Sequence, residues 1–151
     1  MTRATAAGHR KSPLLGISKA AEECGVSERA LRYYQQIGLL TPTGSTPGGL
    51  RRYSEADLAR VRRIRELQSL LGLDLDEIRV VLASDDRLAA IRAEYHAASE
   101  GSARRAQLLR QALKVREELA ATVDAKIAGL QAFRADLTAS MDRVRSLLPR
   151  R

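Results

Sequence analysis

The sequence gathers arginine and tyrosine side chains into two short groups, one near position 30 and one near position 52. Their members are Arg29, Arg32, Tyr33, Tyr34, Arg51, Arg52 and Tyr53. A guanidinium group offers a planar fork of hydrogen-bond donors that fits phosphate or guanine, and a tyrosine presents a hydroxyl group on a stiff arm. A single charged helix face is usually only solvated, but two cationic groups so close together favour an anionic partner.

Two short helices joined by a glycine are expected to carry the first group. Apolar residues in 17–24 form one stripe, with Ser18 as the expected N-cap. Gly25 then allows a sharp turn, because glycine reaches left-handed backbone angles without steric cost. Ser27 is the expected N-cap of a second helix, 28–37. This outline predicts a helix-turn-helix, whose second helix enters the major groove of DNA.

The second group follows the stretch 43–50, which is rich in glycine and proline. A glycine-rich turn between two short strands would present Arg51 and Arg52 on a wing beside the second helix. Ser54 and Asp57 then predict a capping-box start to a third helix. We expect that helix to carry several arginines on its solvated faces, where they can also flank DNA: Arg60, Arg62, Arg63 and Arg65.

The next segments are predicted to be helical with breaks between them. Gly72 should end the third helix, and Asp74 with Glu77 should start a short fourth one. The stretch 84–101 is expected to hold another short helix and a joint. From 102 to 148 there is no proline and one glycine, which predicts a single helix on the order of 70 Å long.

That last helix carries an apolar stripe too long for a small domain to cover. Its members are Leu108, Ala112, Val115, Leu119, Val123, Ile127, Leu130, Phe133, Leu137, Met141, Val144 and Leu148. The stripe therefore needs a partner helix, and a second copy of the chain is the simplest candidate. Its average step is close to 3.6 residues, so the seam is not a strict heptad zipper.

Two runs of sequence carry a family resemblance. LRYYQQIGLL (31–40) and RRYSEADLARVRRIREL (51–67) resemble the DNA-binding domain of the MerR family of bacterial transcription regulators, over about residues 15–82. The resemblance implies a mainly α fold, in which a winged helix-turn-helix domain precedes a long C-terminal helix. It also implies that two such helices pair as an antiparallel coiled coil. Carried over residue by residue, it predicts DNA contacts from Ser18, Lys19, Ser27, Arg29, Arg32, Tyr33, Tyr34, Arg51, Arg52 and Tyr53.

The predicted organisation has five parts. They are a disordered basic tail (1–13), the winged helix-turn-helix domain (14–83), a linker with a short helix (84–101), the dimerisation helix (102–148) and a short tail (149–151). The 151 residues carry a net charge of +8, which favours nucleic acid over a membrane as the anionic partner. No apolar run is long enough to span a bilayer, and the N-terminus lacks a signal-peptide core, so a cytoplasmic location is expected.

Enzymatic and metal chemistry find no support in the sequence. His9 and His96 have no companion at metal-ligand spacing, and the acidic pairs lie on polar helix faces. Cys24 is the only cysteine, so neither a disulfide nor a thiolate cluster can form within one chain. We therefore expect no catalytic residues, no metal site and no cofactor. The cysteine-based sensors of the MerR family are excluded for the same reason.

The favoured function is a homodimeric transcription regulator on an inverted-repeat promoter operator. The family resemblance implies that it bends and undertwists the promoter, so that RNA polymerase can engage both promoter elements. Two alternatives remain: a coiled-coil module that controls another transcription factor, and an architectural DNA-binding protein without sequence preference. Three modes of control also remain open: no effector, a small ligand near 84–101 and the coiled coil, or abundance or a protein partner.

Overall fold

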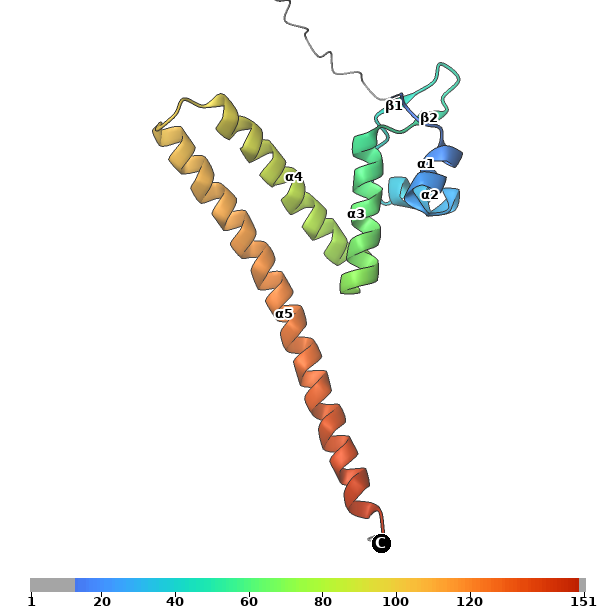
Figure 1. The fold of residues 1–151 in the computed structure, drawn as a ribbon, viewed down its shortest axis with the longest axis vertical. Coiled ribbons are helices and arrows are strands. Elements are labelled where there is room, and N and C mark those ends of the chain that lie inside the picture. The colour runs from blue at the N-terminus through green and yellow to red at the C-terminus, as the bar shows by residue number, and fades with distance from the viewer. Residues whose placement is uncertain (1–12, 150–151) are drawn as a thin grey trace, which may run out of the picture. The chain divides into compact units, whose positions relative to one another are not determined.

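The protein is mainly helical, as predicted (Figure 1). A computed structural model describes residues 13–149, so most of both predicted tails lies outside the described residues. In chain order the elements are α1 (Ile17–Cys24), α2 (Glu28–Gln36), β1 (Gly44–Ser45), β2 (Arg51–Arg52), α3 (Glu55–Leu71), α4 (Leu75–Ala97) and α5 (Ala103–Leu147). The chain divides into two compact units between Arg79 and Val80, and each is described by itself.

Side-chain caps set most helix starts where the sequence predicts them. The Ser27 hydroxyl accepts a hydrogen bond from the Ala30 N–H at 3.1 Å at the start of α2. Ser54 and Asp57 form the predicted capping box of α3. The prediction for Ser18 is wrong, because Gly16 is the N-cap of α1 and Ser18 lies inside the helix. The Ser18 hydroxyl instead donates a hydrogen bond to the carboxylate of Glu28 in α2.

The glycine between α1 and α2 makes the predicted turn. Gly25 has φ 63° and ψ 37°, in the left-handed region that glycine occupies most readily. Arg65 of α3 comes close to this turn, and its Nη1 donates a hydrogen bond to the Cys24 carbonyl oxygen at 2.7 Å. A Cβ atom at position 25 would lie only 2.8 Å from that same nitrogen. The turn therefore depends on glycine for both its backbone angles and its space.

The core of the first unit lies where α1, α2 and α3 meet the wing. Its fully buried large side chains are Leu31, Leu39, Leu40, Tyr53, Leu58, Val61, Ile64, Leu67 and Ile78. Burying an aliphatic side chain of this size contributes about 1.5–3 kcal/mol. These residues come from α2, α3, the loops beside them and the first turn of α4, so the core fixes α2 relative to the wing.

Helix α4 is longer than predicted. The fourth helix was expected to be short and to be followed by a separate helix, but one helix runs without a break from Leu75 to Ala97. No glycine or proline occurs within it. The polar side chain of Ser84, where a break was expected, donates a hydrogen bond to the Val80 carbonyl oxygen at 3.0 Å within the helix. The predicted domain boundaries themselves stay a prediction.

In the second unit, the later part of α4 lies beside the start of α5 (Figure 1). Arg105 of α5 donates hydrogen bonds to the Tyr95 and Ala98 carbonyl oxygens at 3.2 and 3.0 Å, and its guanidinium lies 4.7 Å from the centre of the Tyr95 ring. Arg87 forms an ion pair with Glu118 at 3.1 Å. The two helices thus form an antiparallel hairpin.

This hairpin corrects the reading of the α5 stripe as one continuous dimer seam. Leu108 and Val115 are buried inside the single chain, at 1% exposure each, next to Ile91 of α4. The stripe therefore has a first part that α4 covers and a second part that is exposed. The exposed apolar residues of α5 are Leu109, Leu113, Val123, Ile127, Leu130, Phe133, Leu137, Met141, Val144 and Leu147.

Candidate nucleic-acid interface

The outer face of α2 presents polar and cationic side chains, as predicted. Arg29 is exposed and Tyr33 is 47% exposed. Together with Ser27 and Ala30 they line one shallow surface pocket. Ser27 already uses its hydroxyl oxygen as the helix cap, so it fixes the N-terminal turn of α2 on this face. On this face, α2 therefore presents the guanidinium group of Arg29 and the phenolic hydroxyl of Tyr33, and one ligand could contact both.

Arg32 is held in place by its own helix. Its Nη2 lies 3.0 Å from Glu28 Oε2, one helical turn earlier, and both side chains are substantially exposed. An exposed pair of this kind contributes little to folding stability. Because Ser18 of α1 donates to the same carboxylate, Glu28 links the start of α1 to the face of α2 that carries Arg32.

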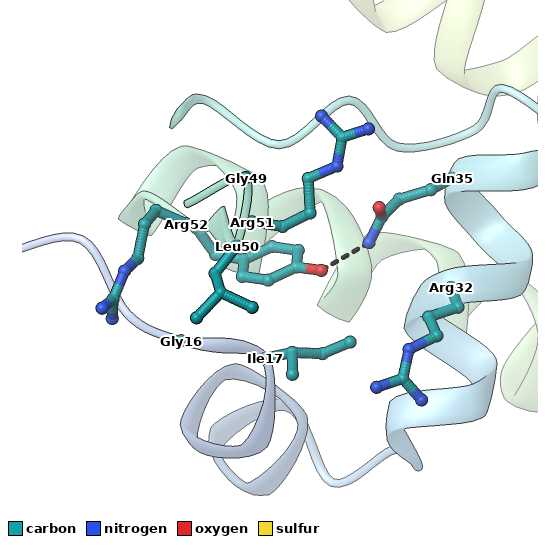
Figure 2. A pocket seen from close by; sticks show the side chains of 9 residues that line it. Gly16, Ile17, Arg32, Gln35, Gly49, Leu50, Arg51 and Arg52 are labelled. Atoms are coloured by element: carbon teal, nitrogen blue, oxygen red, sulfur yellow. Dashed lines mark hydrogen bonds between the residues drawn. The ribbon is translucent and has the colours of Figure 1, made fainter. Parts of the chain in front are cut away.

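The wing is a short antiparallel hairpin. Gly44 pairs with Arg52 and Ser45 with Arg51, and Leu15 exchanges backbone hydrogen bonds with Tyr53 at 2.8 and 2.9 Å. The chain just before α1 thus joins the base of the wing. Successive strand residues point to opposite sides. Accordingly, the guanidinium groups of Arg51 and Arg52 point away from each other (Figure 2).

A recess of about 280 Å³ lies between α2, the start of α1 and the wing (Figure 2). It is lined by Gly16, Ile17, Arg32, Gln35, Gly49, Leu50, Arg51, Arg52 and Tyr53. Three arginines therefore line one concave surface, and no acidic side chain lines it. Arg52 also lies against the start of α1, where a Cβ atom at Gly16 would be 3.4 Å from its Nη1. The recess has the shape and charge to accept a phosphate backbone.

Tyr53 closes the floor of this recess instead of projecting from it. Its side chain is fully buried, at 0% exposure, and its hydroxyl accepts a hydrogen bond from Gln35 Nε2. Burial raises the pKa of the Tyr53 hydroxyl. The expectation of a direct DNA contact from Tyr53 is not supported by this placement. The residue instead ties the wing to α2 and so sets the width of the recess.

Tyr34 does not lie on the outer face of α2, so that prediction is wrong. It is 7% exposed, and its hydroxyl donates a hydrogen bond to Gln68 Oε1 of α3 at 3.2 Å. Burial raises the pKa of this hydroxyl also. The physical reason is helical spacing: Tyr34 follows the buried Leu31 by three positions and shares its face. Tyr33 is the tyrosine of the pair that remains outside.

Ser18 and Lys19 lie in α1 with their side chains exposed. Lys19 Nζ forms an ion pair with Glu22 Oε2 at 2.9 Å. The hydrogen bond to Glu22 and the charge of that carboxylate raise the pKa of the Lys19 ammonium, which therefore stays protonated at neutral pH. Neither residue lines the recess.

Three arginines have a role that the sequence reading missed. Arg60 Nε donates to the Leu39 carbonyl oxygen at 2.6 Å, Arg65 to that of Cys24, and Arg79 Nη2 to that of Ile37 at 2.7 Å. The carbonyls belong to the C-terminal ends of α1 and α2 or to the residues that follow, where peptide groups lack helical partners. Arg60 and Arg65, which were expected to be solvated or to flank DNA, thus join Arg79 in holding the chain at the ends of α1 and α2. Their partners are too distant in sequence for a local pattern to reveal.

Asp57 links the base of the wing to α3. Its Oδ2 accepts hydrogen bonds from the Thr43 N–H at 2.9 Å and from the Ser54 N–H at 2.8 Å. Burial alone would raise the pKa of this carboxyl group, but the hydrogen bonds from Ser54 and Thr43 outweigh it, so the pKa is lowered. Asp57 is therefore ionised at neutral pH and stabilises the start of α3.

Among residues 13–149, no group of three histidine, cysteine or acidic side chains is placed to hold a metal ion. The helices within that range are also too polar or too short to cross a lipid bilayer. Cys24, the single cysteine, is buried in α1 with its Sγ 3.6 Å from the Leu58 carbonyl oxygen. Burial raises the pKa of its thiol, so the thiol stays protonated and packs as a small apolar group.

Residues 15–85 match the family described as MerR HTH family regulatory protein. This segment is a MerR-family domain. The matched range contains α1 to α3, the wing and the start of α4. All the side chains that border the recess therefore lie within the MerR-type domain.

Known relatives support the same assignment. The chain is 43% identical over 72 residues to the mercuric resistance operon regulatory protein of Serratia marcescens, which covers 48% of this chain and 49% of the relative. It is 34% identical over 119 residues to the nodulation protein NolA of Bradyrhizobium elkanii, covering 72% and 54%. The chain thus spans about half the length of the curated relatives it matches.

One solved structure is similar along most of the chain. It is the transcription regulator PbrR691 from Ralstonia metallidurans CH34 in complex with lead(II), with a TM-score of 0.53, 25% sequence identity and 91% of each chain covered. The likeness therefore extends beyond the MerR-type domain into the long C-terminal helix, in agreement with the predicted fold class.

Proposed function

We propose that the protein is a sequence-specific, DNA-binding transcription regulator that acts as a homodimer on an inverted-repeat promoter operator. The observation that carries this proposal is the recess between α2 and the wing, bordered by Arg32, Arg51 and Arg52 within a MerR-type domain. A regulator of the chromosome works in the cytoplasm of a bacterial cell, which is the location we propose.

Each part of the interface has its own role in this proposal. Helix α2 enters the major groove, where Arg29 and Tyr33 reach base edges or phosphates. Arg32, Arg51 and Arg52 contact the phosphates that border the groove. Polar contacts to the DNA backbone come from the side chains of Ser18 and Lys19. Ser27 contributes through the N-terminal turn of α2. Tyr34 and Tyr53 are left out, because both are buried.

The exposed part of the α5 stripe supports a dimer in which two helices run antiparallel. Six of its apolar positions are arranged almost symmetrically about a point between Lys126 and Ile127. Leu109 corresponds to Val144, Leu113 to Met141 and Val123 to Leu130, each pair being equally far from that point within one residue. In an antiparallel pair with its two-fold axis there, apolar positions of one helix face apolar positions of the other. A parallel pair gains nothing from this symmetry.

Disulfide cross-linking distinguishes the two orientations. Ile127→Cys places a thiol next to the axis, where it meets its own copy, so the oxidised protein should run as a covalent dimer. Leu147→Cys places thiols at opposite ends of an antiparallel pair, and it should stay uncross-linked. The unaltered chain is the control, since its single cysteine is buried in α1. Efficient cross-linking at both positions would indicate a parallel pair.

A dimer of this kind holds two recesses along one duplex. Smooth bending of a short site costs on the order of 1–6 kcal/mol, and contacts from two wings and two α2 helices offset that cost. We propose that the distortion brings the promoter elements into the alignment that RNA polymerase requires. The name of one relative, the mercuric resistance operon regulatory protein, is consistent with operon control.

Competition binding tests this function. The full chain should bind the promoter fragment beside its own gene and keep that binding in excess random duplex, because specific sites typically exceed non-specific ones by at least about 10³-fold. Equal affinity for both duplexes would favour an architectural protein. A chain that binds neither duplex at low ionic strength would favour a module that works through protein contacts alone.

A further inference from the structure

A further pocket lies in the α4–α5 hairpin. It has a volume of about 210 Å³ and is lined by Leu88, Ile91, Arg92, Tyr95, Leu108, Leu109, Ala112 and Arg116. We propose that this pocket binds a small organic carboxylate with an apolar body, of the size of benzoate. The binding itself does not depend on the proposed DNA function; only its use as a regulatory signal does.

The walls of the pocket are suited to an apolar body. Aliphatic side chains from both helices form most of the lining, and Tyr95 adds an aromatic ring. Arg105 lies 4.7 Å from the centre of that ring, which fixes the ring's position at one end of the hairpin. Leu108 is buried and Leu109 is 57% exposed, so the apolar lining continues from the hairpin core to the surface. Apolar lining with a few polar groups is the usual composition of a small-molecule site.

Two guanidinium groups set the charge of the expected ligand. Arg92 comes from α4 and Arg116 from α5, and both line the pocket. Among the described residues, neither side chain has a hydrogen bond or ion pair, whereas Arg87, Arg104 and Arg105 on the same hairpin all have acidic partners. No acidic residue lines the pocket. Two unpaired arginines beside apolar walls match a carboxylate, which accepts the paired donors of a guanidinium group.

The size and charge of the pocket argue for a small anion. Drug-sized ligands generally occupy about 300–1,000 Å³, so this pocket suits a smaller molecule. In the proposed dimer, Leu109 would lie opposite Val144 of the other α5, so the ligand and the partner helix would share this edge of the lining. Arg92 and Arg116 favour a carboxylate against the rest of the lining.

The helix that forms one wall of the pocket also reaches the DNA-binding unit. Arg79, near the start of α4, donates its hydrogen bond to the last turn of α2 through the Ile37 carbonyl oxygen. A ligand that favours one conformation of α4 can therefore change DNA affinity by its differential binding to the two conformations. The change in DNA affinity is therefore measured separately from the affinity for the carboxylate.

Titration calorimetry with the full-length chain tests the site. Benzoate and octanoate are the probes, and benzamide is the uncharged match for benzoate. We expect saturable binding of at least one carboxylate and none of benzamide. Arg92→Gln and Arg116→Gln should each weaken that binding by about tenfold or more, the usual effect of losing a charged hydrogen bond. Arg110→Gln is the matched control, since Arg110 is exposed on α5 and does not line the pocket.

A variant that fills the pocket gives an independent test. Ala112→Leu adds an apolar side chain to the lining and should abolish binding, while circular dichroism shows that the helices remain. The proposal is overturned if no carboxylate binds at millimolar concentration, or if Arg110→Gln weakens binding as much as Arg92→Gln does. It is also overturned if Arg92→Gln changes only dimer dissociation, which would assign the pocket to a second copy. Binding without any effect on DNA affinity would support the site and reject its regulatory use.

Discussion

The first unit, which ends at Arg79, and the C-terminal half of α5 are stabilised in opposite ways. In the first, side chains far apart in sequence meet: Arg65 reaches the end of α1, Arg79 reaches the end of α2, and Tyr34 reaches α3. In the second, most side-chain bonds join neighbours on the same helix, such as Arg145 with Asp142, while large apolar residues remain exposed. The first unit therefore supplies its own core, whereas in the second the proposed dimer would cover the exposed apolar residues.

The largest expected difference is in how stability responds to truncation of a leucine. Leu31 is fully buried and Leu130 is 62% exposed. Leu31→Ala should lower the free energy of unfolding by about 2–5 kcal/mol, because it leaves a cavity in the core. This loss should not depend on protein concentration. Leu130→Ala should destabilise the dimer and have little effect at concentrations where the chain is monomeric. Urea denaturation over a range of concentrations measures both. An identical concentration dependence for the two variants would contradict the comparison.

The turn between α1 and α2 offers a coupled pair of substitutions. Gly25→Ala should lower the free energy of unfolding by about 1–2 kcal/mol from left-handed strain alone, and by more because the new Cβ meets Arg65. In an Arg65→Met background the second contribution should shrink. A double-mutant cycle on thermal or urea unfolding measures the coupling. Strict additivity would show that the contact between Arg65 and the turn is energetically unimportant.

Asp57 should make the DNA-binding unit sensitive to acid. Its folded pKa is lowered from the ordinary 3.8, so its stabilising contribution is present above that value and is lost as the pH falls through the folded pKa. Asp57→Asn should cost about 1 kcal/mol at neutral pH and flatten the stability profile below about pH 4. Asp76→Asn, at an exposed position of α4, is the control. The assignment is rejected if the free energy of unfolding of Asp57→Asn falls with acid as steeply as that of the unaltered chain.

The smallest expected effects concern the phosphate contacts. Arg32→Ala and Arg52→Ala should each reduce the slope of log K against log[salt] by about one unit, since each removes one phosphate contact. Fluorescence anisotropy with a labelled promoter duplex at several salt concentrations measures the slope. Arg110→Ala in α5 should leave it unchanged. Unaltered slopes in both wing and α2 variants would place the DNA elsewhere on the molecule.

Local chemistry in the sequence was sufficient to predict much of the fold. Ser27, Ser54 and Gly25 act through neighbours within a few positions, so their caps and turn are readable from the sequence alone. The outer position of Tyr33 also follows from helical spacing. The family resemblance then ordered these elements, and the match of residues 15–85 confirms it.

Most of the incorrect or missing predictions depend on contacts between distant residues. Tyr34 is polar enough to lie outside, but Gln68 of α3 gives its hydroxyl a buried partner. Leu108 and Val115 appeared to belong to the dimer seam, because nothing in α5 itself shows that α4 folds back over them. The break expected before the stretch 84–101 is absent for a local reason, because the Ser84 hydroxyl bonds within the helix. A one-dimensional pattern reports spacing and caps, and it does not report which other element is adjacent.

The central claim is that two chains, joined through the distal part of α5, place two cationic recesses on one duplex. Sedimentation equilibrium of the full chain with the promoter duplex beside its own gene tests it most directly, because the mass gives the stoichiometry. We predict a complex of two chains and one duplex, formed from a dimer that already exists without DNA. A complex of one chain per duplex, or the absence of any complex at low ionic strength, would contradict the claim.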